Sequence, residues 1–239
     1  MRTMSTPEVS SEPADRIATD VLLWGGVAGA VGFTVVFLVE GAVRNGYDPV
    51  RLAVSYLSLG DGGWVQVATF IVTGILVLGF AVGVRRALLG GLGATGVPVA
   101  IALAGAGLVI AGVFSTMPAF GYPPGTPDGF PSEIPATAYL HVLGALLLFG
   151  GLVAAPLLLA RRLRADGARG AALGSVATAA VVLVFFGASS ADPSGAPFFP
   201  TAAGLLQRVA IVAGLGWLAW LGLSLLSRRA GPSPARIGA

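Results

Sequence analysis

Apolar residues gather in six long runs that are separated by short polar stretches. The runs lie at roughly 21–40, 65–84, 96–116, 139–160, 171–190 and 203–227. Each is close to the ~20 residues with which an α-helix crosses about 30 Å of hydrocarbon. The first run is too long for a signal peptide and lacks a small-residue cleavage site. The pattern predicts an all-α integral membrane bundle of six transmembrane helices.

The polar ends of the chain predict its domain organisation. Residues 1–20 are polar and contain Pro7 and Pro13, which predicts a disordered cytoplasmic tail. Residues 21–227 form one six-helix transmembrane domain, and residues 228–239 form a second cytoplasmic tail.

The first outer loop carries its own helix signals. Asp48 followed by Pro49 is typical of a helix start, and Gly60 is typical of a helix end. Polar residues Asp48, Arg51, Ser55 and Ser58 recur at helical spacing, opposite an apolar side. The sequence therefore predicts a short amphipathic helix over residues 49–59, which lies on or is tucked into the outer surface and does not cross the bilayer.

Composition excludes several chemistries. Hydrophobic residues make up 55% of the chain and charged residues 10%, whereas soluble domains carry roughly 25% charged residues. With no cysteine and no lysine, the chain can form no disulfide, thiolate nucleophile or Schiff base. The single histidine, His141, excludes a bis-histidine haem within one subunit. No nucleotide or metalloprotease motif occurs, and we expect no cofactor and no metal.

The arginines predict an orientation. Eleven of the 14 arginines fall on the side of the chain ends and of the 85–95 and 161–170 loops, and three, Arg44, Arg51 and Arg208, fall on the other side. Cytoplasmic loops of membrane proteins carry the excess of basic residues. Both termini are therefore expected in the cytoplasm. This placement in the membrane explains why basic residues outnumber acidic ones, so we expect no nucleic-acid partner.

Polar residues recur at one depth, about 30 Å from the cytoplasmic boundary by helical rise. They are Glu40, Gln66, Ser115, Thr116, His141, Ser189, Ser190 and Arg208. The outer loops 117–138 and 188–202, rich in proline and aromatic residues, lie beyond this plane. Two interpretations fit: the helices become polar where the bilayer ends, or these residues form an outer-facing pocket under ordered loops.

The pocket interpretation selects candidate residues. The candidate ligand-binding residues are Arg51, Ser55, Gln66, Asp128, Asp192, Gln207 and Arg208. His141 is either a structural residue at a helix end or a general acid/base. We expect Arg208 to share an outer cavity with His141 and to pair with an outer carboxylate, because an unpaired buried charge is costly. A serine hydrolase triad would combine His141 and Asp192 with Ser115, Ser189 or Ser190. No nucleophile-elbow motif in the sequence supports it.

Several segments carry a family resemblance. They are Gly46-Tyr47-Asp48-Pro49-Val50-Arg51 continuing to Trp64-Val65-Gln66, Gly121-Tyr122-Pro123-Pro124-Gly125-Thr126-Pro127, Leu140-His141, and Gly204-Leu205-Leu206-Gln207-Arg208. Over residues 20–226 the chain resembles the domain-of-unknown-function 998 family of bacterial and archaeal membrane proteins. The resemblance implies a six-helix bundle similar in topology to FRAG/DRAM-type proteins, in a prokaryotic cell membrane, and no established activity. Members often show Asp-Pro where this chain has Met117-Pro118, so an aspartate role there would be missing or would fall to Asp128.

Three function classes remain open from the sequence. The pocket binds an amphiphilic or anionic small molecule, such as a lipid headgroup, with or without acid/base chemistry at His141. Alternatively, the protein is a non-catalytic partner whose outer loops dock another membrane protein. A transporter ranks third, because no charged residue lies near the membrane midplane. Expected partners are membrane lipids, and a homo-oligomer stays open because small residues recur at four-residue spacing, as in Gly151/Ala155 and Gly170/Gly174.

Overall fold

The structure, a computed structural model, describes residues 12–190 and 202–230. This part of the chain contains six long α-helices and one short 3₁₀ helix and no strand. The long helices are α1 (Glu12–Val43), α2 (Gly63–Ala87), α3 (Gly96–Val113), α4 (Ala136–Ala165), α5 (Arg169–Ser190) and α6 (Ala203–Ala230); the 3₁₀ helix is η1 (Val54–Ser58). All six long helices are long and apolar enough to cross a membrane. The predicted fold class is confirmed.

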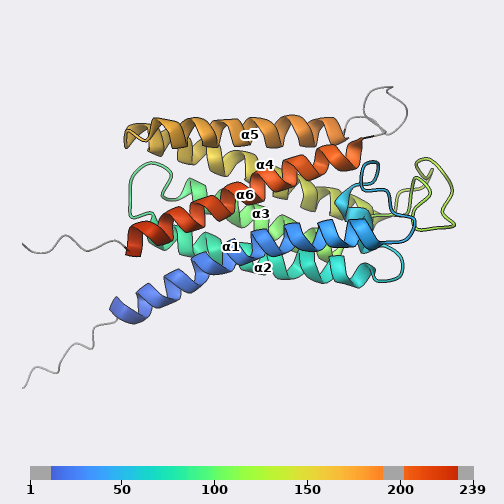
Figure 1. Ribbon diagram of the computed structural model, residues 1–239, viewed down its shortest axis with the longest axis horizontal. Coiled ribbons are helices and arrows are strands. Elements are labelled where there is room, and N and C mark those ends of the chain that lie inside the picture. The colour runs from blue at the N-terminus through green and yellow to red at the C-terminus, as the bar shows by residue number, and fades with distance from the viewer. Residues whose placement is uncertain (1–11, 191–201, 231–239) are drawn as a thin grey trace, which may run out of the picture.

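The helices form a closed ring. Each packs against its neighbour in the chain, and α6 returns to pack against α1. Figure 1 shows them running along the long axis, with the start of α1 and the end of α6 at one end of the bundle and η1 at the other. We call these the terminal end and the loop end. At the terminal end, Arg229 Nε donates a hydrogen bond of 2.7 Å to Asp20 Oδ1.

Close backbone contact between helices depends on glycine. A Cβ atom at Gly107 of α3 would lie 2.4 Å from the carbonyl oxygen of Gly144 in α4. One at Gly151 would lie 2.4 Å from the carbonyl oxygen of Ala100. Such approach is how membrane helices gain packing energy where lipid offers no hydrophobic drive. Gly170 and Gly174, in contrast, have open space beside them, so their spacing does not mark a contact within the described chain.

Two boundaries differ from the sequence predictions. Helix α1 begins at Glu12, so residues 12–20 are helical rather than part of a disordered tail; residues 1–11 lie outside the description. In the first loop, residues 49–51 form a turn and only Val54–Ser58 is helical, as a 3₁₀ turn. Ala53 between them is extended, with φ −60° and ψ 153°. The predicted element is therefore present and does not span, but it is shorter than 49–59 and mostly buried.

Candidate functional site at the loop end

The first turn of α6 is bound to the loop that follows α1. We call residues 47–54 of this loop the strap. The backbone amide of Gly204 donates to the carbonyl of Arg51 (3.2 Å), and that of Leu205 donates to the carbonyl of Val50 (3.0 Å). The first amides of a helix have no acceptor within the helix. Carbonyl groups of the strap supply acceptors here, and this use of its backbone explains why the strap does not continue as an α-helix.

Two side-chain positions of α6 complete this attachment. Oε1 of Gln207 accepts a hydrogen bond of 2.8 Å from the backbone amide of Val54. At Gly204, a Cβ atom would lie 2.2 Å from the carbonyl oxygen of Leu52, a distance that no real side chain tolerates. The strap can therefore lie this close to α6 only where the helix has a glycine.

Arg208 lies beneath the strap and is 7% exposed. Its Nη1 donates to the carbonyls of Pro49 (2.6 Å), Leu52 (3.0 Å) and Gly204 (3.0 Å). Backbone carbonyls buried without a donor are costly. The guanidinium therefore stabilises the loop conformation by satisfying carbonyls that the turn leaves unpaired.

The other amino group of Arg208 meets Tyr47. Nη2 donates a hydrogen bond of 2.6 Å to the Tyr47 hydroxyl, which in turn donates toward the carbonyls of Leu52 and Ala53, each 3.0 Å away. The guanidinium carbon also lies 5.8 Å from the centroid of the Phe37 ring and 5.5 Å from that of Tyr47. Burial raises the pKa of Tyr47, although the nearby positive charge acts in the opposite direction. Tyr47 is thus a neutral partner of this cation.

The expected carboxylate partner of Arg208 is not observed in the described residues. The ion pairs there are Arg44–Glu40, Arg162–Asp166 and Arg229–Asp20. Asp192, an outer carboxylate among the candidate residues, lies outside the described residues. Carbonyl dipoles and ring faces surround Arg208 instead, which is a second way to lower the cost of burying a cation.

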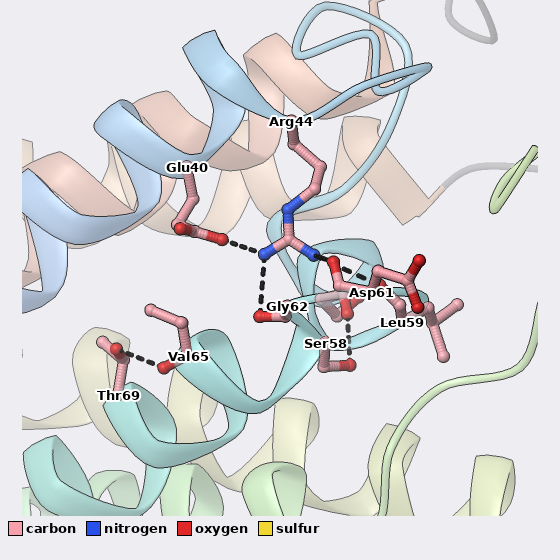
Figure 2. Close-up of polar contacts among 9 residues, drawn as sticks. Glu40, Arg44, Ser58, Leu59, Asp61, Gly62, Val65 and Thr69 are labelled. Carbon is pink, nitrogen blue, oxygen red and sulfur yellow. Dashed lines mark hydrogen bonds and ion pairs between the residues drawn. The ribbon is translucent and has the colours of Figure 1, made fainter.

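Arg44 ties the end of α1 to the start of α2. Figure 2 shows its guanidinium between the Glu40 carboxylate, with which it forms an ion pair, and the backbone of the α2 entry. Nη1 donates to the carbonyl of Asp61 (2.7 Å) and Nη2 to that of Gly62 (2.9 Å). Both charged side chains are largely buried, at 11% and 17% exposure. Arg44 therefore holds the end of the first loop and Arg208 holds its middle in the same way, through carbonyl groups.

The loop between α3 and α4 covers the strap. Tyr122 is 2% exposed and packs edge-on against Tyr47, with ring centroids 5.4 Å apart. Phe120 adopts φ 55°, a conformation that non-glycine residues rarely occupy, and its amide donates to the carbonyl of Gly129 (2.9 Å). These contacts make the loop an ordered cap, as its proline and aromatic content predicted.

His141 closes the end of α3. Its Nδ1 lies 2.8 Å from the carbonyl oxygen of Phe114 and 3.1 Å from that of Ala111. Carbonyl oxygens only accept, so Nδ1 carries the proton and donates. The last carbonyls of a helix otherwise lack donors. In the neutral ring Nε2 is then an acceptor, and no described residue hydrogen-bonds to it. This geometry gives His141 a structural role and leaves one ring nitrogen for a further contact.

Gln66 differs from the buried polar residues above, whose side chains have hydrogen-bond partners. It lies in the first turns of α2 and is 0% exposed. Its Oε1 and Nε2 are the buried side-chain atoms of the described chain that have no hydrogen-bond partner. Buried amides in native proteins are nearly always paired, and each unpaired group costs roughly 1–3 kcal/mol. Gln66 is therefore a buried amide that no described residue satisfies.

Phenyl rings separate Arg208 from His141. Phe37, beside Arg208, has its centroid 5.8 Å from that of Phe33. Phe33 is 5.3 Å from Phe70, and Phe70 is 6.3 Å from the imidazole of His141. The two residues lie at the ends of this series and no hydrogen bond joins them. The described contacts therefore do not show the outer cavity that Arg208 and His141 were expected to share.

An apolar groove runs between α1 and α2 near this end. Its volume is about 320 Å³, and its lining includes Gly29, Gly32, Phe33, Trp64, Thr69 and Thr73. Phe33 and Thr73 are almost completely buried, whereas Trp64 is 73% exposed. Phe33 thus faces the groove and also packs on Phe70, one helical turn from Gln66.

The other predicted residues lie around the strap and the cap. Arg51 is exposed and acts through its backbone carbonyl; Ser55 is half-buried and its carbonyl accepts a 2.6 Å hydrogen bond from Ser58 Oγ. Asp128 is exposed in the cap. Sequence reasoning missed Tyr47, although it stands in one of the motifs quoted above, next to residues that were selected for their charge.

The arrangement defines a multi-pass membrane protein: six apolar helices, a terminal end with most of the arginines and a loop end closed by ordered loops. A family model described as "Protein of unknown function (DUF998)" matches residues 27–224, and the chain belongs to this family. A search of curated proteins and a search of solved structures both find no match.

Proposed function

We propose that the loop end binds the polar group of an amphiphilic small molecule, and that Gln66 is its main contact. The observation that carries this proposal is the fully buried amide of Gln66, for which the described residues supply neither a donor nor an acceptor. A ligand that supplies a donor and an acceptor to this amide offsets the cost of its desolvation. A leucine-sized residue would fill the same space without that cost, so the amide is best explained by what it binds.

The available contacts favour an uncharged, hydroxyl-bearing group. Gln66 offers one carbonyl oxygen and two N–H donors, and the neutral His141 ring offers an acceptor at Nε2. The nearby guanidinium groups of Arg44 and Arg208 are directed at loop carbonyls. A hydroxyl group both donates and accepts, which matches this set, and it carries no charge that would need a free counter-ion.

The apolar part of the ligand fits the groove between α1 and α2. From Trp64 to Leu76, both of which line it, α2 rises about 18 Å, which is roughly half of a bilayer's hydrocarbon thickness. Phe33 lies between the groove and Phe70. Gln66 does not itself line the groove, so a lipid with its tail there must insert its polar group past Phe33 to reach the amide.

The orientation belongs to the same proposal. The arginines gather at the terminal end, and this asymmetry supports cytoplasmic termini in a prokaryotic cell membrane. The loop end then faces the outside, and the groove lies in the outer leaflet. The ligand is accordingly an outer-leaflet amphiphile.

Mass spectrometry of retained lipid tests the proposal. The wild-type protein and the Gln66→Leu variant are purified in dodecyl maltoside, and bound amphiphiles are extracted and identified. We expect a hydroxyl-bearing amphiphile with the wild type and at least a tenfold loss in the variant. Gln207→Leu is the matched control, because it removes a glutamine at the same end that already has a partner, and it should retain the ligand. Equal retention by all three proteins would refute the proposal.

A further inference from the structure

A second hollow lies at the opposite end of the bundle, between α1 and α6. Its volume is about 670 Å³, and its lining includes Arg16, Asp20, Trp24, Leu223 and Arg229. It shares no residue with the loop end. Both helices that form it are chain-terminal helices, and they are joined there by polar contacts.

The polar contacts place two guanidinium groups at the mouth of this hollow. Arg16 Nη2 donates to the carbonyl of Arg229 (2.7 Å), and Arg229 Nη2 donates to the carbonyl of Arg16 (3.3 Å). Arg229 Nε also pairs with Asp20. Two cations and one carboxylate leave a net positive charge at the mouth. Each guanidinium retains further N–H donors, since Arg carries five.

The hollow becomes apolar with depth. Trp24 lies one helical turn deeper than Asp20, and Leu223 lies about 9 Å deeper than Arg229 by helical rise. Trp24 is 54% exposed and Leu223 is 46% exposed, so both are accessible from the membrane. Tryptophan at such a level is typical of a membrane–water interface.

We propose that this hollow binds an anionic phospholipid, with its phosphate at Arg16 and Arg229 and an acyl chain along Trp24 and Leu223. Arginine recognises phosphate through paired N–H donors. A net positive charge favours a lipid with net negative charge, such as phosphatidylglycerol, over the zwitterionic phosphatidylcholine. The apolar depth favours a phospholipid over a free phosphate ion.

Trp24 provides the measurement. Brominated phosphatidylglycerol or brominated phosphatidylcholine is titrated into the purified protein in dodecyl maltoside, and tryptophan quenching is followed. The signal of Trp24 is the difference between the wild type and Trp24→Phe. One net charge near a membrane surface is worth about 1 kcal/mol, so we expect phosphatidylglycerol to bind about fivefold more tightly. Inorganic phosphate should not compete at equal concentration.

Single substitutions distinguish a specific phosphate site in the hollow from a general attraction between a basic protein and an anionic lipid. Arg16→Gln and Arg229→Gln should each remove the preference for phosphatidylglycerol. Arg86→Gln is the matched control, because Arg86 is an exposed arginine at the last turn of α2 and does not line the hollow, and it should keep the preference. Equal quenching by both lipids in the wild type, equal loss in Arg86→Gln, or competition by inorganic phosphate would each overturn the proposal.

Discussion

Arg208 Nη2 donates a 2.6 Å hydrogen bond to the hydroxyl of Tyr47, and the two residues are 161 positions apart in the chain. This bond joins the last helix to the loop after the first one. It belongs to a network in which α6 holds the strap by its backbone amides, by Gln207 and by Arg208. The loop end is therefore a built structure, in which α6 and a loop distant in sequence are held together.

Truncation of Arg208 should be costly. Arg208→Ala leaves the part-buried carbonyl of Pro49 and the Tyr47 hydroxyl without their guanidinium donor, and leaves the Leu52 carbonyl with only the Tyr47 hydroxyl. We expect a loss of roughly 2–4 kcal/mol. The exposed Arg228 is the control, and Arg228→Ala should change stability by less than about 0.5 kcal/mol. Thermal unfolding in detergent gives the comparison. Small, equal effects would mean that Arg208 is only a boundary residue.

A methyl group at Gly204 should displace the strap. The Cβ of Gly204→Ala would lie 2.2 Å from the Leu52 carbonyl oxygen, so either helix α6 or the strap must shift. Gly216 lies in the same helix with open space beside it. Gly216→Ala should be neutral or should stabilise by up to about 1 kcal/mol, because alanine favours helix. Equal melting temperatures for the two variants would contradict the observed packing.

Tyr56 should make stability depend on alkaline pH. It lies in η1, outside the membrane-spanning helices, and burial raises its pKa from 10.0 to about 12. Between pH 10 and pH 12 the unfolded chain ionises this tyrosine and the folded chain does not, so stability falls as pH rises, by up to about 2–3 kcal/mol. Tyr56→Phe should reduce this fall and change little at pH 7. Unfolding measured across this range checks the slope, and an unchanged slope in the variant would refute the assignment.

The orientation can be measured without a background signal, because the chain has no cysteine. Glu133 is exposed in the cap and Ala165 is exposed at the end of α4. In intact cells, Glu133→Cys should react with a membrane-impermeant maleimide and Ala165→Cys should react only after lysis. The reverse pattern would invert the proposed topology and place the Gln66 site in the inner leaflet.

Hydropathy predicted the six helices because crossing a bilayer requires long apolar runs, and each helix shows one. The strap was harder to predict. Asp48 does cap the turn as expected, through the amides of Val50 and Arg51, but α6 binds the carbonyls that an α-helix over 49–59 would have used. Such a competition between residues more than 150 positions apart leaves no local pattern.

The site could be predicted only in part, because its contacts also depend on residues that are far apart in the chain. Sequence reasoning selected Arg208 and Gln207 for their polarity and assumed that a buried cation needs a carboxylate. The partners are backbone carbonyls, which every residue carries and which no motif reveals. Gln66 was selected by depth alone. That it lacks any partner follows only from how its neighbours pack.

The most direct test of the central claim is the melting temperature of the wild type and of Gln66→Leu, each with and without added monoolein, an uncharged hydroxyl-bearing amphiphile. Without monoolein, the variant should melt higher, because leucine removes an unpaired buried amide. Monoolein should raise the melting temperature of the wild type by several degrees, because it binds the folded state. It should leave the melting temperature of the variant unchanged. A variant that melts lower without monoolein, and an equal response of both proteins to it, would show that Gln66 is a structural residue and not a binding site.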